Sequence, residues 1–151
     1  MNRDENISVL RETVRLLERK LGLLNEIQAS CCGVTFAQCH AIVEIGRAKS
    51  ISLNDLANIL GLDKSTMSRT VNHLVNSHLA VREIEPKDRR YILISLTEEG
   101  WNTYKTIEAE MNAYFAQVYH RLPEDKRAQV VESLQLLLQA LAANECCQKC
   151  M

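Results

Sequence analysis

The sequence predicts a mainly α-helical protein with a single small β-hairpin. Apolar residues recur at steps of three and four over most of the chain, which is the period of a helix with one buried face. Only residues 81–96 change to a short, alternating pattern that is typical of strands. With two prolines and five glycines in 151 residues, little of the sequence suits linkers or long loops. We therefore expect packed helices joined by short turns.

The overall composition is that of an ordinary globular protein, with 46% apolar and 25% charged residues. The N-terminus carries no secretory signal pattern, and no segment approaches the ~18 uninterrupted apolar residues that a membrane span needs. We expect a cytoplasmic protein with no membrane partner.

Charge is unevenly distributed along the chain, although the net charge is only −1. Residues 47–91 hold eight Lys or Arg residues against five Asp or Glu, whereas the rest of the chain holds ten against fourteen. A basic middle segment between acidic flanks is compatible with contact to nucleic acid.

A long helix is predicted over residues 6–29, followed by a second helix over residues 35–47. Gly33 marks the break between them, and Thr35 is suited to cap the second helix. The apolar residues of the first helix form the a/d seam of a helix that packs against another helix. These residues are Ile7, Leu10, Val14, Leu17, Leu21 and Leu24.

Two short helices are predicted next, with room for only a tight turn between them. Ser52 and Asp55 resemble a capping box that opens the first, which ends at Gly61. Asp63 can cap the second, which is expected to run to about residue 79. Two short helices with a glycine-containing turn form a helix-turn-helix. We expect its internal interface to consist of Leu56, Ala57, Leu60, Leu62, Met67 and Val71.

The alternating segment predicts strands over residues 81–85 and 91–96 with a turn at 86–88, a hairpin that would form a wing. Thr97 then starts a helix over residues 98–121, whose first residues, Glu98 and Glu99, suit the positive end of the helix dipole. Pro123 favours the start of a last helix. That helix carries a broad apolar stripe, consisting of Val130, Val131, Leu134, Leu137, Leu138 and Leu141.

This order of elements resembles the MarR family of bacterial transcriptional regulators. The most specific match is the segment DRRYILISLTEEG at residues 88–100. It is similar to that family's wing, an Asp-x-Arg followed by a strand and by Leu-Thr-x-x-Gly at the start of the next helix. The resemblance implies a winged helix-turn-helix DNA-binding domain over residues 35–97 and a helical dimerisation region over residues 1–34 and 98–151. It also implies a homodimeric DNA-binding repressor rather than an enzyme.

In such a fold the second helix of the helix-turn-helix enters the major groove of double-stranded DNA. The resemblance places Lys64, Ser65, Thr66, Ser68, Arg69, Thr70 and His73 there. Arg69 is the first candidate for reading a base, because a guanidinium can contact guanine bidentately. Two subunits would read a pseudo-palindromic operator with half-sites about 34 Å apart. No cofactor is required for this binding.

The wing supplies the remaining predicted DNA contacts. Arg90 matches the arginine with which the family probes the minor groove, and Asp88 would orient it through a charge-assisted pair. We expect Lys87 and Arg89 to contact phosphates.

Six cysteines in a chain without a signal peptide indicate a reducing compartment, where thiols bind metals or sense redox state. The Cα atoms of adjacent cysteines are about 3.8 Å apart, which disfavours a disulfide but offers two thiolates to one soft centre. We hypothesise that a thiophilic metal or metalloid effector such as arsenite or zinc binds here and releases the operator. The candidate ligands are Cys31, Cys32, Cys39, His40, Cys146, Cys147 and Cys150.

Other interpretations stay open at this point. The cysteines could be oxidised as redox sensors, or could be small core residues without a role in sensing. The whole chain could instead be a protein-interaction module without DNA affinity. An oxidoreductase centre at Cys147 and Cys150 would need a strand-helix context that the tail lacks, so we do not expect an enzyme.

Overall fold

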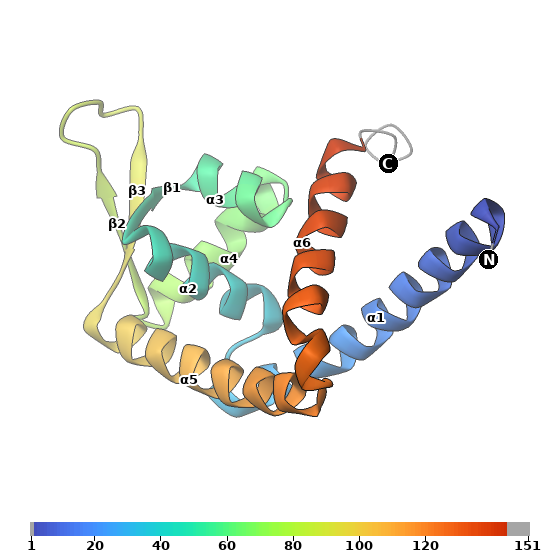
Figure 1. Cartoon of the computed structure of the whole chain (residues 1–151). Helices are drawn as coiled ribbons and strands as arrows, with labels where there is room; N and C mark the ends of the chain where they lie inside the picture. Colours follow the sequence, from blue (N-terminus) through green and yellow to red (C-terminus); the bar gives the residue numbers. More distant parts are fainter. Residues whose placement is uncertain (1, 145–151) are drawn as a thin grey trace. The chain divides into compact units, whose positions relative to one another are not determined.

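A computed structural model describes residues 2–144, with the backbone alone for residues 23–32. Its helices are α1 (Arg3–Cys32), α2 (Phe36–Ala48), α3 (Leu53–Leu60), α4 (Lys64–Asn76), α5 (Glu98–Arg121) and α6 (Arg127–Ala143), with a 3-10 turn η1 (Glu124–Lys126) before α6. Strands β1 (Ser50–Ser52), β2 (Ala80–Ile84) and β3 (Ile92–Leu96) form an antiparallel sheet in the order β1-β3-β2 (Figure 1). The mainly α fold with a small hairpin is confirmed.

The chain divides into two compact units, Met1–Ala109 and Glu110–Met151, with the boundary inside α5. The first unit holds the helix-turn-helix and the sheet, and the second holds the end of α5 with α6. The predicted division into a DNA-binding domain at 35–97 and a dimerisation region concerns function rather than compactness, and it stays a prediction.

The first two helices begin at reciprocal caps. Asn2 and Glu5 exchange hydrogen bonds between side chain and backbone, so α1 starts three residues earlier than predicted. At its other end α1 continues to Cys32, where Gly33 adopts the left-handed conformation (φ 68°) that ends the helix. Thr35 caps α2 as predicted, and Gln38 completes the capping box.

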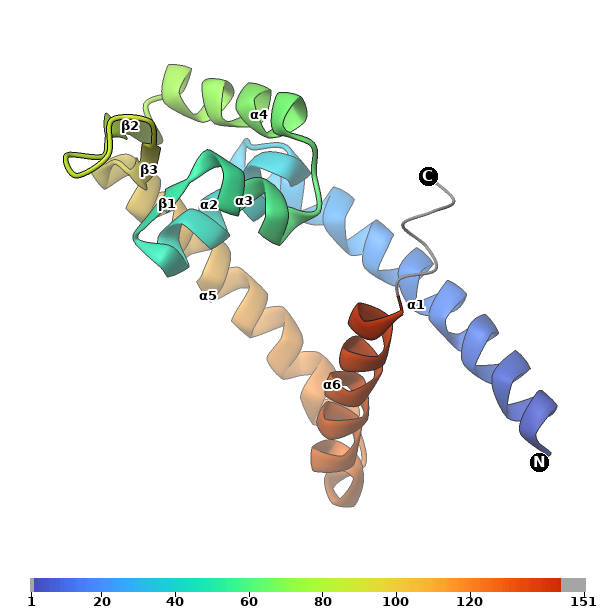
Figure 2. The same cartoon turned by 90° about the horizontal axis from the view of Figure 1, so that it is seen from above.

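The helix-turn-helix consists of α3 and α4, which are joined by the short turn visible in Figure 2. The Ser52 hydroxyl accepts the amide of Asp55, and Gly61 ends α3 in the left-handed region (φ 64°), both as predicted. The predicted end of α4 at residue 79 is wrong. The helix stops at Asn76 because His78 takes a positive φ of 61° and turns the chain into β2.

The core of the first unit lies between α2, α3, α4 and the sheet. Of the predicted helix-turn-helix interface, Leu56, Ala57, Met67 and Val71 are buried, whereas Leu60 and Leu62 are half-buried. The largest fully buried side chains are Ile42, Ile45, Leu56, Met67, Leu74, Ile94 and Val71.

Strand β1 was not predicted. It pairs Ser50 with Ser95 and Ser52 with Leu93 on the free edge of β3. Three residues with a single buried side chain, Ile51, are too short to show an alternating pattern, so only the tertiary pairing reveals this strand.

Helix α5 has the predicted bounds, and its first turn is held against the preceding chain. The Thr97 hydroxyl accepts the amide of Gly100 at 3.0 Å and donates to the carbonyl of His78 at 2.6 Å. In the second unit, Pro123 precedes η1 rather than the last helix directly. Arg127 donates to the carbonyls of Tyr119, His120 and Leu122, which closes the turn between α5 and α6.

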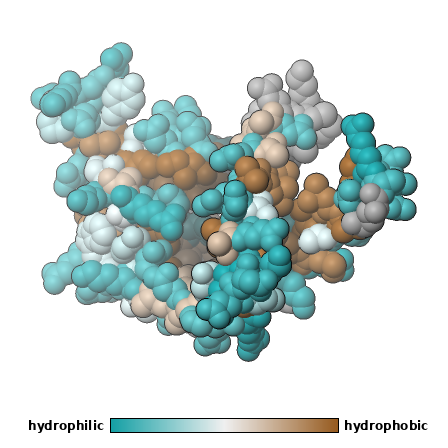
Figure 3. Space-filling view, in the orientation of Figure 1, coloured by the Kyte–Doolittle hydropathy of each residue, from teal (hydrophilic) through white to brown (hydrophobic). Residues whose placement is uncertain are grey.

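Both units expose apolar side chains on their helices, and brown atoms lie at the surface of α1 and α6 in Figure 3. On α1, Ile7 and Leu10 are 55% and 50% exposed. In the second unit the exposed set is Tyr114, Phe115, Val118, Tyr119, Val131, Leu134, Leu136, Leu138 and Leu141. No helix within the described residues is long and apolar enough to cross a membrane.

Candidate nucleic-acid interface

Helix α4 begins at a cap that fixes its first turn. The Asp63 carboxylate accepts hydrogen bonds from the hydroxyl and the amide of Thr66. These hydrogen bonds stabilise the ionised carboxylate and hold the pKa of Asp63 below its ordinary value. The residues that follow the cap are therefore presented on a well-defined helical turn.

The predicted DNA-contacting residues of α4 differ in how much surface they offer. Lys64, Ser65, Arg69 and His73 are exposed, and Thr66 and Ser68 are half-buried. Thr70 is only 7% exposed, and its hydroxyl donates to the carbonyl of Thr66 one turn earlier. We therefore leave Thr70 out of the proposed contact surface, because its one donor is already used within the helix.

Arg69 lacks the intramolecular partner that some other arginines have. Arg47 pairs with Glu44, and Arg90 pairs with Asp88. Arg69 makes no ion pair or hydrogen bond with any residue of the described part of the chain. Its positive charge is thus left for an external partner.

An open cleft of about 390 Å³ lies between the start of α2 and the exposed side of α4. Its lining residues have polar or charged side chains and include no carboxylate, although most of the surface that they expose to the cleft is apolar; they are Thr35, Gln38, Thr66, Arg69, Thr70 and His73. The sequence indicated Thr35 as a helix cap and gave no reason to consider Gln38. The Thr-x-x-Gln spacing signals a capping box, and nothing in that local pattern reveals that α4 lies opposite.

The wing presents Arg90 as part of a bidentate ion pair. Arg90 donates from Nε to Oδ1 of Asp88 at 3.0 Å and from a terminal nitrogen to Oδ2 at 2.9 Å. These bonds and the Arg90 amide lower the pKa of Asp88 from its ordinary value. The predicted orienting pair is therefore present, while the side chain of Arg90 stays 86% exposed.

The rest of the wing tip is exposed, including Lys87 and Arg89. The tight turn lies at Asp88–Tyr91, where the Tyr91 amide donates to the Asp88 carbonyl, rather than at residues 86–88 as predicted. Both cations are exposed, and their contact with phosphates stays a prediction.

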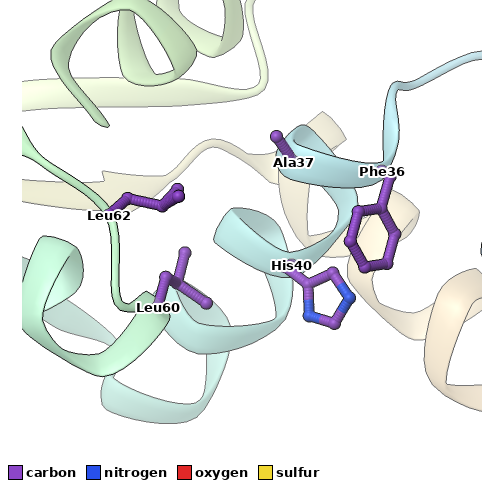
Figure 4. Close-up of a pocket in the computed structure, with 5 residues that line it drawn as sticks. All are labelled: Phe36, Ala37, His40, Leu60 and Leu62. Carbon is purple, nitrogen blue, oxygen red and sulfur yellow. The ribbon is translucent and has the colours of Figure 1, made fainter. Parts of the chain in front are cut away.

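The predicted thiol site is not assembled by the part of the chain that the structure describes. Cys39 is 6% exposed and belongs to the core face of α2. His40 is exposed and lines an open, largely apolar pocket with Phe36, Ala37, Leu60 and Leu62 (Figure 4). Among the described residues, no three His, Cys, Asp or Glu side chains lie close enough to hold a metal ion.

The surroundings of the His40 ring are largely apolar. Its ring meets the edge of the Phe36 ring at a centroid distance of 4.2 Å. Partial burial lowers the pKa of His40, and the charge of Glu44 opposes this shift.

The remaining cysteines were predicted as ligands from the sequence. Cys31 and Cys32 are the last two residues of α1, but their side chains lie outside the description. Cys146, Cys147 and Cys150 lie outside the described residues altogether.

Comparison with known proteins agrees with this geometry. The profile of the MarR family matches residues 33–90. The chain is 24% identical over 117 residues to the HTH-type transcriptional regulator BilQ of Clostridium symbiosum, covering 78% of this chain and 81% of BilQ. It is 27% identical over 113 residues to the HTH-type transcriptional repressor MdtR of Bacillus subtilis, covering 75% and 73%. Streptococcus pneumoniae FabT, solved in complex with DNA, has the same fold, with a TM-score of 0.79, 19% identity and coverage of 88% and 97%.

Proposed function

We propose that the chain is a DNA-binding transcriptional regulator of the MarR family rather than an enzyme, and that it acts as a cytoplasmic, homodimeric repressor. The observation that carries the proposal is the exposed, uncompensated cationic surface of α4 next to a wing whose arginine is already oriented by Asp88. In this proposal α4 enters the major groove and the wing follows the backbone to the minor groove.

The exposed apolar faces support a dimer. On α1, the described part of the predicted seam stays open to solvent, with Leu17 and Leu21 still 39% and 41% exposed. The second unit adds exposed aromatic and aliphatic side chains, such as Phe115 and Leu138. Exposed apolar side chains in such numbers indicate interaction sites in soluble proteins. A second copy would bury it and bring two α4 helices to one pseudo-palindrome.

DNA affinity is expected to depend steeply on salt. Each phosphate contact contributes about −0.9 to the slope of log K against log salt, so three contacts per subunit predict a slope of about −5 for the dimer. Fluorescence anisotropy with the DNA upstream of the chain's own gene, at a series of salt concentrations, measures this slope. A protein-interaction module would show no binding at any salt, and that result would contradict the proposed repressor.

The proposed signal is a thiophilic metal or metalloid such as arsenite, bound by Cys31, Cys32 and the tail cysteines. Two features support it. The cysteine pair ends α1 directly before the left-handed Gly33, so a bound ion would act on the joint that leads into α2. The second feature is the cluster of soft ligands itself, which suits such an ion. We exclude Cys39 from this set because it is buried in the core face of α2.

Arsenite is expected to release the operator from the wild-type protein under reducing conditions. A coupling free energy of about 1–3 kcal/mol between the two ligands is sufficient for such a switch. DNase footprinting on the upstream DNA, with and without arsenite, measures the release. Cys32→Ser should keep its protection in arsenite, because it removes one ligand of the pair.

Cys39→Ala is the matched control, since it removes a thiol that the structure places in the core. It should still be released by arsenite. Protection that survives arsenite in the wild type contradicts the metalloid proposal. Release by peroxide instead, with loss of the effect in Cys32→Ser, would assign the cysteines to redox sensing.

A further inference from the structure

The cleft between α2 and α4 gathers side chains that can donate hydrogen bonds to an oxyanion. Two of its lining residues, Arg69 and His73, bring nitrogen donors from α4, while Thr35 and Gln38 belong to the start of α2. No carboxylate belongs to the lining, and the nearby Asp63 carboxylate is occupied by the hydroxyl and the amide of Thr66. The cleft also shares Arg69 with the exposed face of α4 that we propose meets the DNA.

The capping box orients the Gln38 amide within this cleft. Its Oε1 accepts the amide of Thr35 at 3.2 Å, and its own backbone amide donates to the Thr35 hydroxyl at 3.3 Å. With the oxygen used in the cap, the NH₂ group is left to donate. Neither that NH₂ group nor Arg69 has a hydrogen-bond partner in the described part of the chain.

We propose that this cleft holds one phosphate of the DNA backbone in each half-site, and that Gln38 of α2 is part of the DNA interface. The inference rests on the proposed function and extends it. The sequence predicted DNA contacts only for α4 and the wing, whereas the cleft adds residues of α2. The Gln38 NH₂ and the Arg69 guanidinium donate to the phosphate oxygens, with His73 at the same cleft.

Gln38→Glu tests the proposal with an almost isosteric change. Glutamate at this position keeps the capping box, because its carboxylate can accept the same Thr35 amide. It replaces the NH₂ donor by an anionic oxygen facing the phosphate. We expect an unchanged melting temperature and an affinity for DNA about tenfold weaker or more, by anisotropy, since a charge-assisted hydrogen bond is exchanged for repulsion.

Gln129→Glu on α6 is the matched control, because it makes the same change of charge on an exposed residue that does not line the cleft. Equal affinities of Gln38→Glu and Gln129→Glu would overturn the cleft assignment while leaving the repressor proposal intact. Absence of DNA binding by the wild type would overturn the repressor proposal itself.

A phosphate scan separates direct contact from an indirect effect. Single methylphosphonates are placed along each half-site, which removes one backbone charge at a time. One position should weaken wild-type binding markedly and leave Gln38→Glu unaffected, since the variant has already lost that contact. If the loss of affinity caused by Gln38→Glu adds to the loss caused by the methylphosphonate at every position, no phosphate is held at Gln38 and the proposal is contradicted.

Discussion

Gly100→Ala is expected to destabilise the protein by about 3 kcal/mol or more. A Cβ at residue 100 would overlap the carbonyl oxygen of Leu79 and would lie 3.0 Å from the carbonyl carbon of the same residue. That oxygen is backbone and already accepts the amide of Thr97, so it cannot move aside without breaking the junction of β2 and α5. Thermal unfolding followed by circular dichroism should show a melting temperature lower by about 10 °C.

Two other glycines provide graded controls for this prediction. At Gly22 nothing lies within 4 Å of the position that a Cβ would take, so Gly22→Ala should stabilise α1 by about 0.5–1 kcal/mol. At Gly46 the added carbon would meet the Tyr104 ring at 2.5 Å, and a side chain can shift where backbone cannot. We expect the change in stability caused by Gly46→Ala to lie between the changes caused by Gly22→Ala and Gly100→Ala. A Gly100→Ala protein as stable as the wild type would contradict the observed packing.

Arg90→Ala is expected to weaken operator binding about 100-fold, if each wing of the dimer loses about 1–2 kcal/mol. The side chain is 86% exposed, so its removal should change stability little and affinity strongly. Anisotropy at fixed salt gives the affinity, and circular dichroism checks the fold. The effect should be larger on the operator than on unrelated DNA, because in the proposed complex the guanidinium reads the shape of the minor groove.

Asp88→Ala distinguishes the orientation of Arg90 by Asp88 from the contact of Arg90 with DNA. It removes the bidentate partner of Arg90 but leaves the guanidinium in place, so we expect a smaller loss of affinity. Arg121→Ala, an exposed arginine at the end of α5, is the control for loss of one positive charge. Equal affinities of Arg90→Ala and Arg121→Ala would rule out the proposed role of the wing.

The local features could be predicted from the amino-acid sequence alone, because their signals lie within a few residues of each other. Thr35, Ser52 and Asp63 cap their helices as predicted, since a capping side chain bonds to an amide three residues later. The Asp88 and Arg90 pair is equally local. The family pattern around it was sufficient to predict the winged helix-turn-helix.

Features set by long-range packing could not be predicted in this way. The end of α4 depends on His78, whose carbonyl accepts the Thr97 hydroxyl from nineteen residues along the chain. Strand β1 exists because β3 has an edge to pair with. Burial separated Cys39 from the proposed ligands, although its place in the sequence made it look equivalent to them.

In the candidate site, too, some features could be predicted from local sequence and others depend on long-range packing. The spacing of residues on α4 and the wing indicated which side chains could meet DNA, because a helix or hairpin places them by its own geometry. The cleft that joins Gln38 to Arg69 exists only when α2 packs beside α4. Contacts between residues so far apart in the chain are decided by the packing of the core, and no local pattern encodes them.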